Sequence, residues 1–185
     1  MSTFSQALDC ITANNLDGLR LALTNVDANS NEGELLWAAA NLGHTAIVRH
    51  LIDVTDPQFF EGALVAAVAM KRNECIGMLL QHVEHSPNSA LWIACEQADV
   101  DLVYEILPHC SVYENICVLK FAVLTRDQEL FDRVVAESNL DEWKHHIIGS
   151  KEEQEFLRTN FKAMHENYTL RAHIGPVSSS VKRKM

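Results

Sequence analysis

The stretch that decides the fold is residues 35–52, LLWAAANLGHTAIVRHLI. Weaker copies of it recur along most of the chain at a nearly constant spacing. Aligned on their first core position, the five copies are anchored at Ala7, Leu36, Leu64, Leu91 and Leu119, with steps of 29, 28, 27 and 28 residues. A fixed period of this length is typical of proteins built from stacked repeats. The sequence therefore predicts a repeat array rather than a fold organised around a catalytic motif.

Each copy contains two short amphipathic patterns separated by a polar break. In the clearest copy, the small residues Ala39 and Ala40 are followed by apolar doublets at 47–48 and 51–52. Apolar residues at i, i+3 and i+4 indicate helices, and strand-like alternation is hard to find anywhere. We therefore expect an all-α protein in which each copy is a pair of antiparallel helices. One pair cannot bury enough surface alone, so stacking of the pairs must supply the core.

The segment LWAAANLGHTAIVRHLI is similar to the ankyrin repeat, with its Leu, two Ala, a Gly-His turn and an Ile-Val…Leu-Leu second helix. The other copies depart from it at Gly43 and His44, where they have Lys71 and Arg72, Ala98 and Asp99, and Arg126 and Asp127. Ankyrin repeats run to about 33 residues, so the resemblance implies trimmed connections and reduced hairpin fingers. We expect an ankyrin-like α-solenoid of about five helix pairs; a different helical-hairpin solenoid stays open, although tetratricopeptide and HEAT units fit the spacing less well.

The repeat pattern changes after residue 136. A helical pattern within 138–149 is followed by a capping box at Ser150 and by a longer helix, which Gly175-Pro176 ends. This helix has one apolar face, formed by Leu157, Phe161, Met164 and Tyr168. We expect residues 1–136 to form the array, residues 137–172 to cap it within the same structural domain, and residues 173–185 to be a flexible basic tail.

The charge of the chain points away from nucleic acid. The net charge is −10, and residues 1–136 contribute −11 from 18 acidic and seven basic residues. An acidic array favours a partner protein with a basic or mixed surface, unless the acidity serves solubility alone. The chain has no signal-peptide pattern and no apolar run of about 18 residues, and its five cysteines are odd in number. We expect a cytoplasmic protein, without a membrane span and monomeric.

The chain lacks the familiar motifs of catalysis and cofactor binding. It contains no nucleophile elbow, phosphate-binding loop, zinc-protease motif or CxxC pair. His82 and His85 near Cys75 have the nearest approach to metal-ligand spacing, but two solvated histidines at a helix end is the preferred interpretation. His109-Cys110 as an activated thiol, and His145 with His146 as a catalytic pair, are not favoured. We therefore expect no enzyme, no cofactor and no metal.

Two tryptophans occupy equivalent positions in their copies. Trp37 and Trp92 each follow the anchoring leucine by one residue, where the ankyrin repeat usually has a His that ties neighbouring repeats together. The preferred prediction is a structural role between repeats. The alternative is a pair of aromatic anchors for a partner, because protein interfaces favour such residues.

The resemblance also implies where a partner binds. Ankyrin-like proteins hold ligands on their concave side, which the two residues after each small pair would face. These residues are Asn41, Leu42, Ala69, Met70, Glu96, Gln97, Leu124 and Thr125. Leu42, Met70 and Leu124 are either an exposed apolar stripe or part of the packing between repeats. We expect a non-enzymatic protein-protein interaction module; alternatives are an inhibitor or adaptor acting on a partner enzyme, a bacterial effector acting in a host cell or, less favoured, a small Cys/His enzyme.

Overall fold

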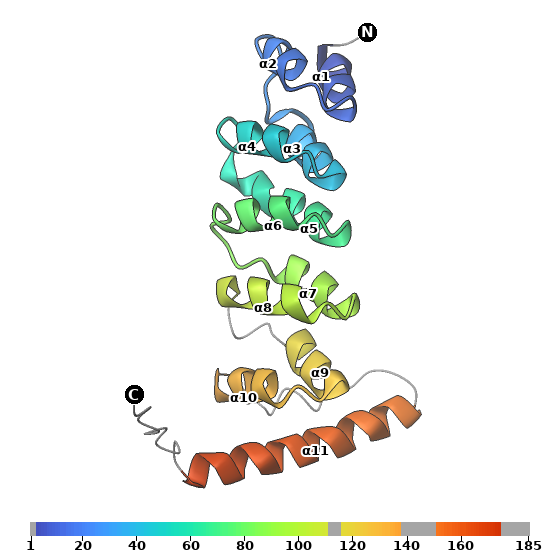
Figure 1. Ribbon diagram of the computed structural model, residues 1–185, viewed down its shortest axis with the longest axis vertical. Coiled ribbons are helices and arrows are strands. Elements are labelled where there is room, and N and C mark those ends of the chain that lie inside the picture. The colour runs from blue at the N-terminus through green and yellow to red at the C-terminus, as the bar shows by residue number, and fades with distance from the viewer. Residues whose placement is uncertain (1–2, 111–115, 138–150, 175–185) are drawn as a thin grey trace, which may run out of the picture. The chain divides into compact units, whose positions relative to one another are not determined.

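The computed structural model describes residues 3–110, 116–137 and 151–174, and within these ranges the chain is helical with no strand (Figure 1). The all-α prediction is confirmed. The chain divides into two compact units, Met1–Ser111 and Val112–Met185, called unit 1 and unit 2 below. In the described parts, no helix is long and apolar enough to cross a membrane.

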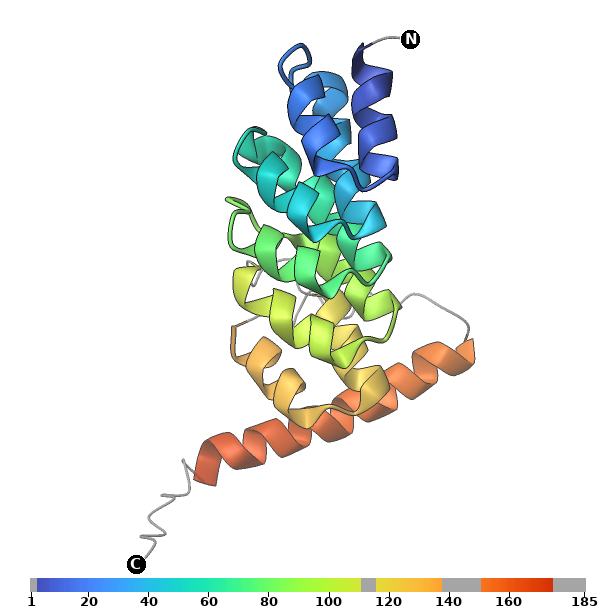
Figure 2. The ribbon, with the colours of Figure 1, turned by 45° about the horizontal axis from the view of Figure 1, so that its top comes forward.

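Unit 1 consists of four consecutive helix pairs within residues 3–110. The pairs are α1 (Thr3–Thr12) with α2 (Leu16–Ala22), α3 (Ser30–Leu42) with α4 (Thr45–Ile52), α5 (Phe60–Ala69) with α6 (Asn73–Leu80), and α7 (Asn88–Glu96) with α8 (Val100–Ile106). Two short 3-10 helices, η1 (Pro57–Phe59) and η2 (Leu107–His109), precede α5 and follow α8. The first helices of successive pairs contact one another in the order α1, α3, α5, α7 (Figures 1 and 2).

The turn inside each pair has the same backbone conformation in every copy. Its central residue has a positive φ: Asn14 (52°), Gly43 (81°), Lys71 (54°), Ala98 (53°) and Arg126 (57°). The next N–H donates to a carbonyl five residues back, as from His44 to Ala39 (3.0 Å) and from Arg72 to Ala67 (2.8 Å). These bonds define a Schellman helix end, which favours glycine. The copies without Gly43 therefore differ in residue type at this turn and keep its geometry.

Small residues lie where neighbouring first helices meet. Ala39, Ala40 and Ala67 are fully buried, whereas the second helices bury larger side chains such as Ile47 and Leu51. Because a methyl group occupies little space, the first helices approach closely, and the longer side chains fill the layer behind them. The buried side chains of unit 1 therefore lie at the apolar positions of the sequence pattern.

Unit 2 combines one further helix pair with a long single helix. α9 (Ile116–Thr125) and α10 (Gln128–Glu137) form the pair, and α11 (Lys151–Ile174) packs against both (Figure 1). Leu157 and Met164 of α11 are buried, and the ring of Phe161 lies edge-on to Phe131 at 5.4 Å. The predicted apolar face of α11 is thus the face that packs.

The division of the chain falls at a different place from the predicted boundary at residue 136. α9 and α10 group with α11 in unit 2, and both contact the long helix. α11 ends at Ile174, immediately before the Gly175-Pro176 stop and two residues into the segment expected to be the tail. The helical pattern within 138–149, Ser150 and residues 175–185 lie outside the described residues.

Candidate functional site

The first helices of unit 1 have one side that their neighbours do not cover. Three positions on each of α3, α5 and α7 lie on this side: two residues before, one residue after and five residues after the anchoring leucine, a spacing of i, i+3 and i+7. They are Glu34, Trp37 and Asn41 on α3, Gly62, Val65 and Ala69 on α5, and Ser89, Trp92 and Glu96 on α7; none is buried. We call these nine residues the first-helix face.

Trp37 and Trp92 are the largest side chains of the first-helix face. Their exposed fractions are 47% and 51%, so neither is a core residue. The preferred prediction of a structural role between repeats did not anticipate this exposure. The physical reason is that Leu36, Ala39 and Ala40 already fill the sector of α3 that faces its neighbours. Trp37, one residue after Leu36, points about 100° away from it around the helix axis.

The charged side chains on the first helices themselves have one sign. The described helices α1, α3, α5 and α7 contain five Asp or Glu residues and no Lys or Arg. Glu34 accepts a hydrogen bond from Asn31 (3.1 Å), and Glu61 accepts one from the Ser89 hydroxyl (3.0 Å). Residues three or four apart are neighbours on a helix surface, so each tryptophan has a glutamate one turn away. The pairs are Trp37 with Glu34, and Trp92 with Glu96.

The middle helix of the face carries small side chains between the two tryptophans. α5 contributes Gly62, Val65 and Ala69 at the three face positions. A Cβ added to Gly62 would meet no atom within 4 Å, so packing does not require a glycine there. A glycine inside a helix also lowers stability relative to alanine. The face is therefore open at its centre. Gly62, which lies there, lowers the stability of the helix and is not required by packing.

Six of the eight predicted binding residues lie in unit 1. Asn41, Ala69 and Glu96 belong to the first-helix face. Leu42 and Met70 lie beside it at the turn ends of their helices, with exposed fractions of 39% and 46%. Gln97 is half-buried, and its Nε2 donates to the carbonyl of Ala69 at 3.0 Å, which ties α7 to α5. The structure thus brings these six residues to three adjacent helices.

The other two predicted residues belong to unit 2. Leu124 has an exposed fraction of 44% at the end of α9, and the Thr125 hydroxyl donates to the carbonyl of Phe121 (2.9 Å). Leu42, Met70 and Leu124 are each exposed, as one of the two interpretations of this apolar stripe required. Because the stripe is divided between units, the described site consists of the residues of unit 1.

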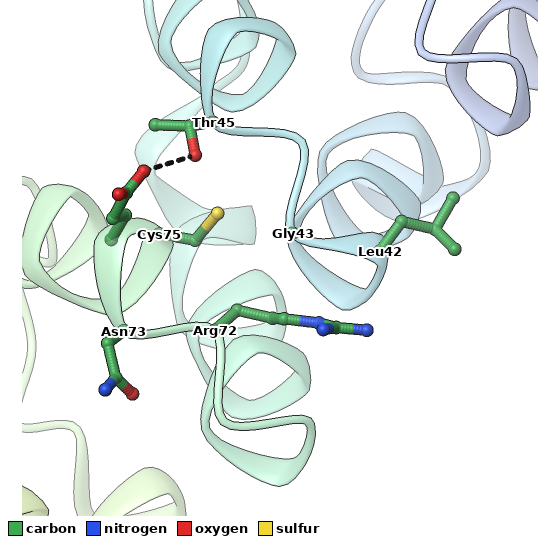
Figure 3. A pocket seen from close by; sticks show the side chains of 7 residues that line it. Leu42, Gly43, Thr45, Arg72, Asn73 and Cys75 are labelled. Atoms are coloured by element: carbon green, nitrogen blue, oxygen red, sulfur yellow. Dashed lines mark hydrogen bonds between the residues drawn. The ribbon is translucent and has the colours of Figure 1, made fainter.

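A small open pocket lies between the turns of two successive pairs in unit 1. It has a volume of about 160 Å³ and is lined by Leu42, Gly43, Thr45, Arg72, Asn73, Glu74 and Cys75 (Figure 3). The Arg72 side chain extends past Gly43 and donates from Nε to the carbonyl of Asn41 (3.0 Å). Thr45 donates to Glu74 (3.0 Å). Small-molecule sites usually enclose about 300–1,000 Å³, so this pocket is too small for that role.

Cys75 contributes its sulfur to this pocket, and its surroundings raise the pKa of the thiol. Burial is the main cause that raises the pKa of the Cys75 thiol above its usual value, and Glu74 adds to it. The hydrogen bond with Thr45 and the positive charge of Arg72 oppose the shift without cancelling it. A nucleophilic cysteine needs a lowered pKa, so Cys75 has the properties of a core residue.

The histidines singled out in the sequence lie apart from any ligand set. His82 and His85 are exposed, and the His82 ring is edge-on to Phe60 at 6.2 Å. Across the part of the chain that the structure describes, no group of three His, Cys, Asp or Glu side chains is placed to hold a metal ion. His109 is exposed, whereas the Cys110 sulfur donates to the carbonyl of Ile106 at 3.6 Å. His145 and His146 lie outside the described residues.

Comparisons of this chain with protein-family models, curated proteins and solved structures found no match. A functional assignment therefore depends on the residues of the site. Sequence reasoning identified three residues of the first-helix face as binding residues, namely Asn41, Ala69 and Glu96. It also gave Trp37 and Trp92 as aromatic anchors in the alternative interpretation. The i, i+3, i+7 spacing around the anchoring leucine was the pattern that could have found the other four.

Proposed function

We propose that this chain is a non-enzymatic protein-binding module, an ankyrin-like α-solenoid that presents the first-helix face to another protein. The observation that carries the proposal is the exposure of Trp37 and Trp92 on one face of three successive first helices, α3, α5 and α7. Burying an indole removes a large apolar area from water, and tryptophans are enriched among the residues that dominate binding energy. Two half-exposed tryptophans at repeat-equivalent positions are therefore the natural anchors of an interface.

The regularity of unit 1 supports the ankyrin-like part of the proposal. The positive-φ turn residues follow one another at the spacing of the anchoring residues, and the seven-residue connections at 23–29, 53–59 and 81–87 are short. Stacked repeats that contact only their neighbours give an extended, rigid surface. Such a surface suits recognition of a protein segment better than enclosure of a small molecule.

The residues around the first-helix face support a protein partner as well. Leu42 and Met70 extend the exposed apolar surface toward the turns of their helix pairs. Arg72 and Gln97 hold these turns by donating to main-chain carbonyls of the preceding pair. A face fixed in this way loses little conformational entropy when a partner binds, which favours affinity.

The test is affinity capture with the full chain and two matched variants. The double variant Trp37→Ala/Trp92→Ala removes both indoles from the face. The control, Leu21→Ala, removes an even more exposed apolar side chain (73%) from α2, outside the face. We expect the wild type and the Leu21→Ala variant to retain the same partner, and the double variant to bind it about 30-fold more weakly, which corresponds to about 2 kcal/mol.

Circular dichroism of the three proteins separates binding from folding. We expect equal helical content, since neither tryptophan belongs to the core. A double variant that retains the partner with unchanged affinity would exclude the first-helix face as the binding site. A double variant that loses helical content would show that the tryptophans are structural.

A further inference from the structure

We infer, building on the proposed function, that the first-helix face binds an extended basic segment of its partner, with two Arg or Lys side chains seated on Trp37 and Trp92. The charge of the surface is the first argument. The three helices that form the face, α3, α5 and α7, carry four acidic residues and no basic one, and two of the four, Glu34 and Glu96, lie on the face itself, so a basic segment is attracted to it. Nucleic acid carries the same sign as the face and is repelled by it.

The four basic residues of unit 1 lie outside the first helices. Arg20 and Arg49 lie on the second helices α2 and α4. Lys71 and Arg72 lie in the turn after α5, where Lys71 pairs with Asp99 (3.2 Å) and Arg72 donates to Asn41 (3.0 Å). The glutamates beside the tryptophans are therefore available to a cation from outside.

The chemistry of each tryptophan position fits a cationic side chain. A guanidinium or ammonium group is attracted to the face of an indole ring, and guanidinium also pairs with a carboxylate. Trp37 has Glu34 one turn before it, and Trp92 has Glu96 one turn after it. Glu34 keeps acceptor positions beyond the one that Asn31 uses, because a carboxylate has about four lone-pair sites. A purely apolar segment would cover these carboxylates without pairing them, which is unfavourable.

The distance between the two tryptophans sets the spacing of the two cations. Trp37 and Trp92 lie on the first and third of three adjacent helices, α3, α5 and α7. Packed helices are about 8–10 Å apart and an extended chain advances about 3.3 Å per residue, so the cations would be about five or six residues apart. Between them, Gly62, Val65 and Ala69 leave room for the main chain of the segment.

The first experiment selects displayed random dodecapeptides on the full-length protein. We expect enriched peptides to carry Arg or Lys five or six residues apart, and to bind more weakly as salt rises, because exposed charge pairs are screened. Fluorescence anisotropy then measures the affinity of an enriched peptide. The variant Glu34→Gln/Glu96→Gln should bind it about tenfold more weakly while keeping wild-type helical content.

A matched pair of variants at Gly62 tests the sign of the charge. An added side chain at this position enters open space, so Gly62→Arg and Gly62→Glu should both fold as the wild type does. We expect Gly62→Arg to weaken binding of the enriched peptide about tenfold, and Gly62→Glu to preserve or strengthen it. Equal effects of the two variants would overturn the inference.

The outcomes separate this inference from the proposed function. Suppose that the enriched peptides are apolar or acidic and that the Trp37→Ala/Trp92→Ala variant no longer binds them. This result would overturn the inference of a basic segment and would leave the proposed binding face in place. The absence of enrichment, or peptides that bind the double variant as well as the wild type, would overturn both. Basic peptides whose affinity depends on the glutamates and the tryptophans would support both.

Discussion

The position that carries Trp37 and Trp92 in unit 1 carries Lys120 in unit 2. The charge of the two units differs in the same way. Residues 1–111 contain 14 acidic and four basic residues, a net charge of −10, whereas residues 112–185 contain 11 of each. The helix pair itself, with its buried small residues and its positive-φ turn, is common to both units. The acidic, aromatic face is therefore a property of unit 1, and a helix pair can form without it.

The two units also differ in the element that packs against a helix pair. In unit 1, each pair packs against the next pair through short first helices. In unit 2, the 24-residue helix α11 lies on α9 and α10, where Arg171 pairs with Asp132 (3.0 Å) and Gln128 donates to the carbonyl of Met164 (3.1 Å). The same kind of helix pair can thus pack against another pair or against a single long helix.

The largest expected effect comes from removing the Phe131 side chain from the core of unit 2. Phe131 is fully buried and contacts Phe161 of α11, so Phe131→Ala should cost about 3–5 kcal/mol of stability. Hydrogen exchange followed by mass spectrometry should show faster exchange in 116–137 and 151–174, with a smaller change in 3–110. Equal acceleration throughout would mean that the two units unfold as one and would weaken the comparison between them.

The turns of unit 1 offer a pair of opposite substitutions. Gly43→Ala places a Cβ at a φ of 81° and 2.8 Å from Cδ of Arg72, and should lower stability by about 1–2 kcal/mol. Ala98→Gly relieves a φ of 53° and should raise stability by up to about 1 kcal/mol. Urea unfolding measures both. Stabilisation by Gly43→Ala would contradict the equivalence of these turns.

The open position on the first-helix face gives a smaller effect. Gly62→Ala adds a methyl group where no atom lies within 4 Å, and alanine favours the helix. Stability should rise by about 0.5–1 kcal/mol, again measured by urea unfolding. A loss of stability would show that the middle of the face is packed, and the room assigned to a bound segment would not exist.

The smallest effect concerns Cys75. Its pKa is raised mainly by burial, so at a given pH less of it is thiolate than in the unfolded chain. The stability that this shift contributes is complete below the pKa of the unfolded thiol and is lost as pH rises through the folded pKa. Among the five cysteines, we expect Cys75 to react last with iodoacetamide in the native protein, as followed by mass spectrometry. Early modification of Cys75 would mean that the pocket opens.

The repeat period and the helical pairing could be predicted from the sequence, because each depends on local spacing. The anchors Leu36, Leu64 and Leu91 and the small residues after them are buried as their pattern required. The exposure of Trp37 and Trp92 could not be predicted, since it depends on how far a neighbouring helix reaches around α3 or α7. The division into two units could not be predicted either, since the repeat pattern and its cap by themselves predict one structural domain.

The most direct test of the binding face is photo-crosslinking to the captured partner. A benzophenone amino acid is introduced at position 62 in the face, at position 21 on α2 or at position 124 on α9, each in the full chain. We predict crosslinks to the partner from position 62 and none from position 21. Crosslinks from position 21 or 124 without any from position 62 would contradict the assignment of binding to the first-helix face.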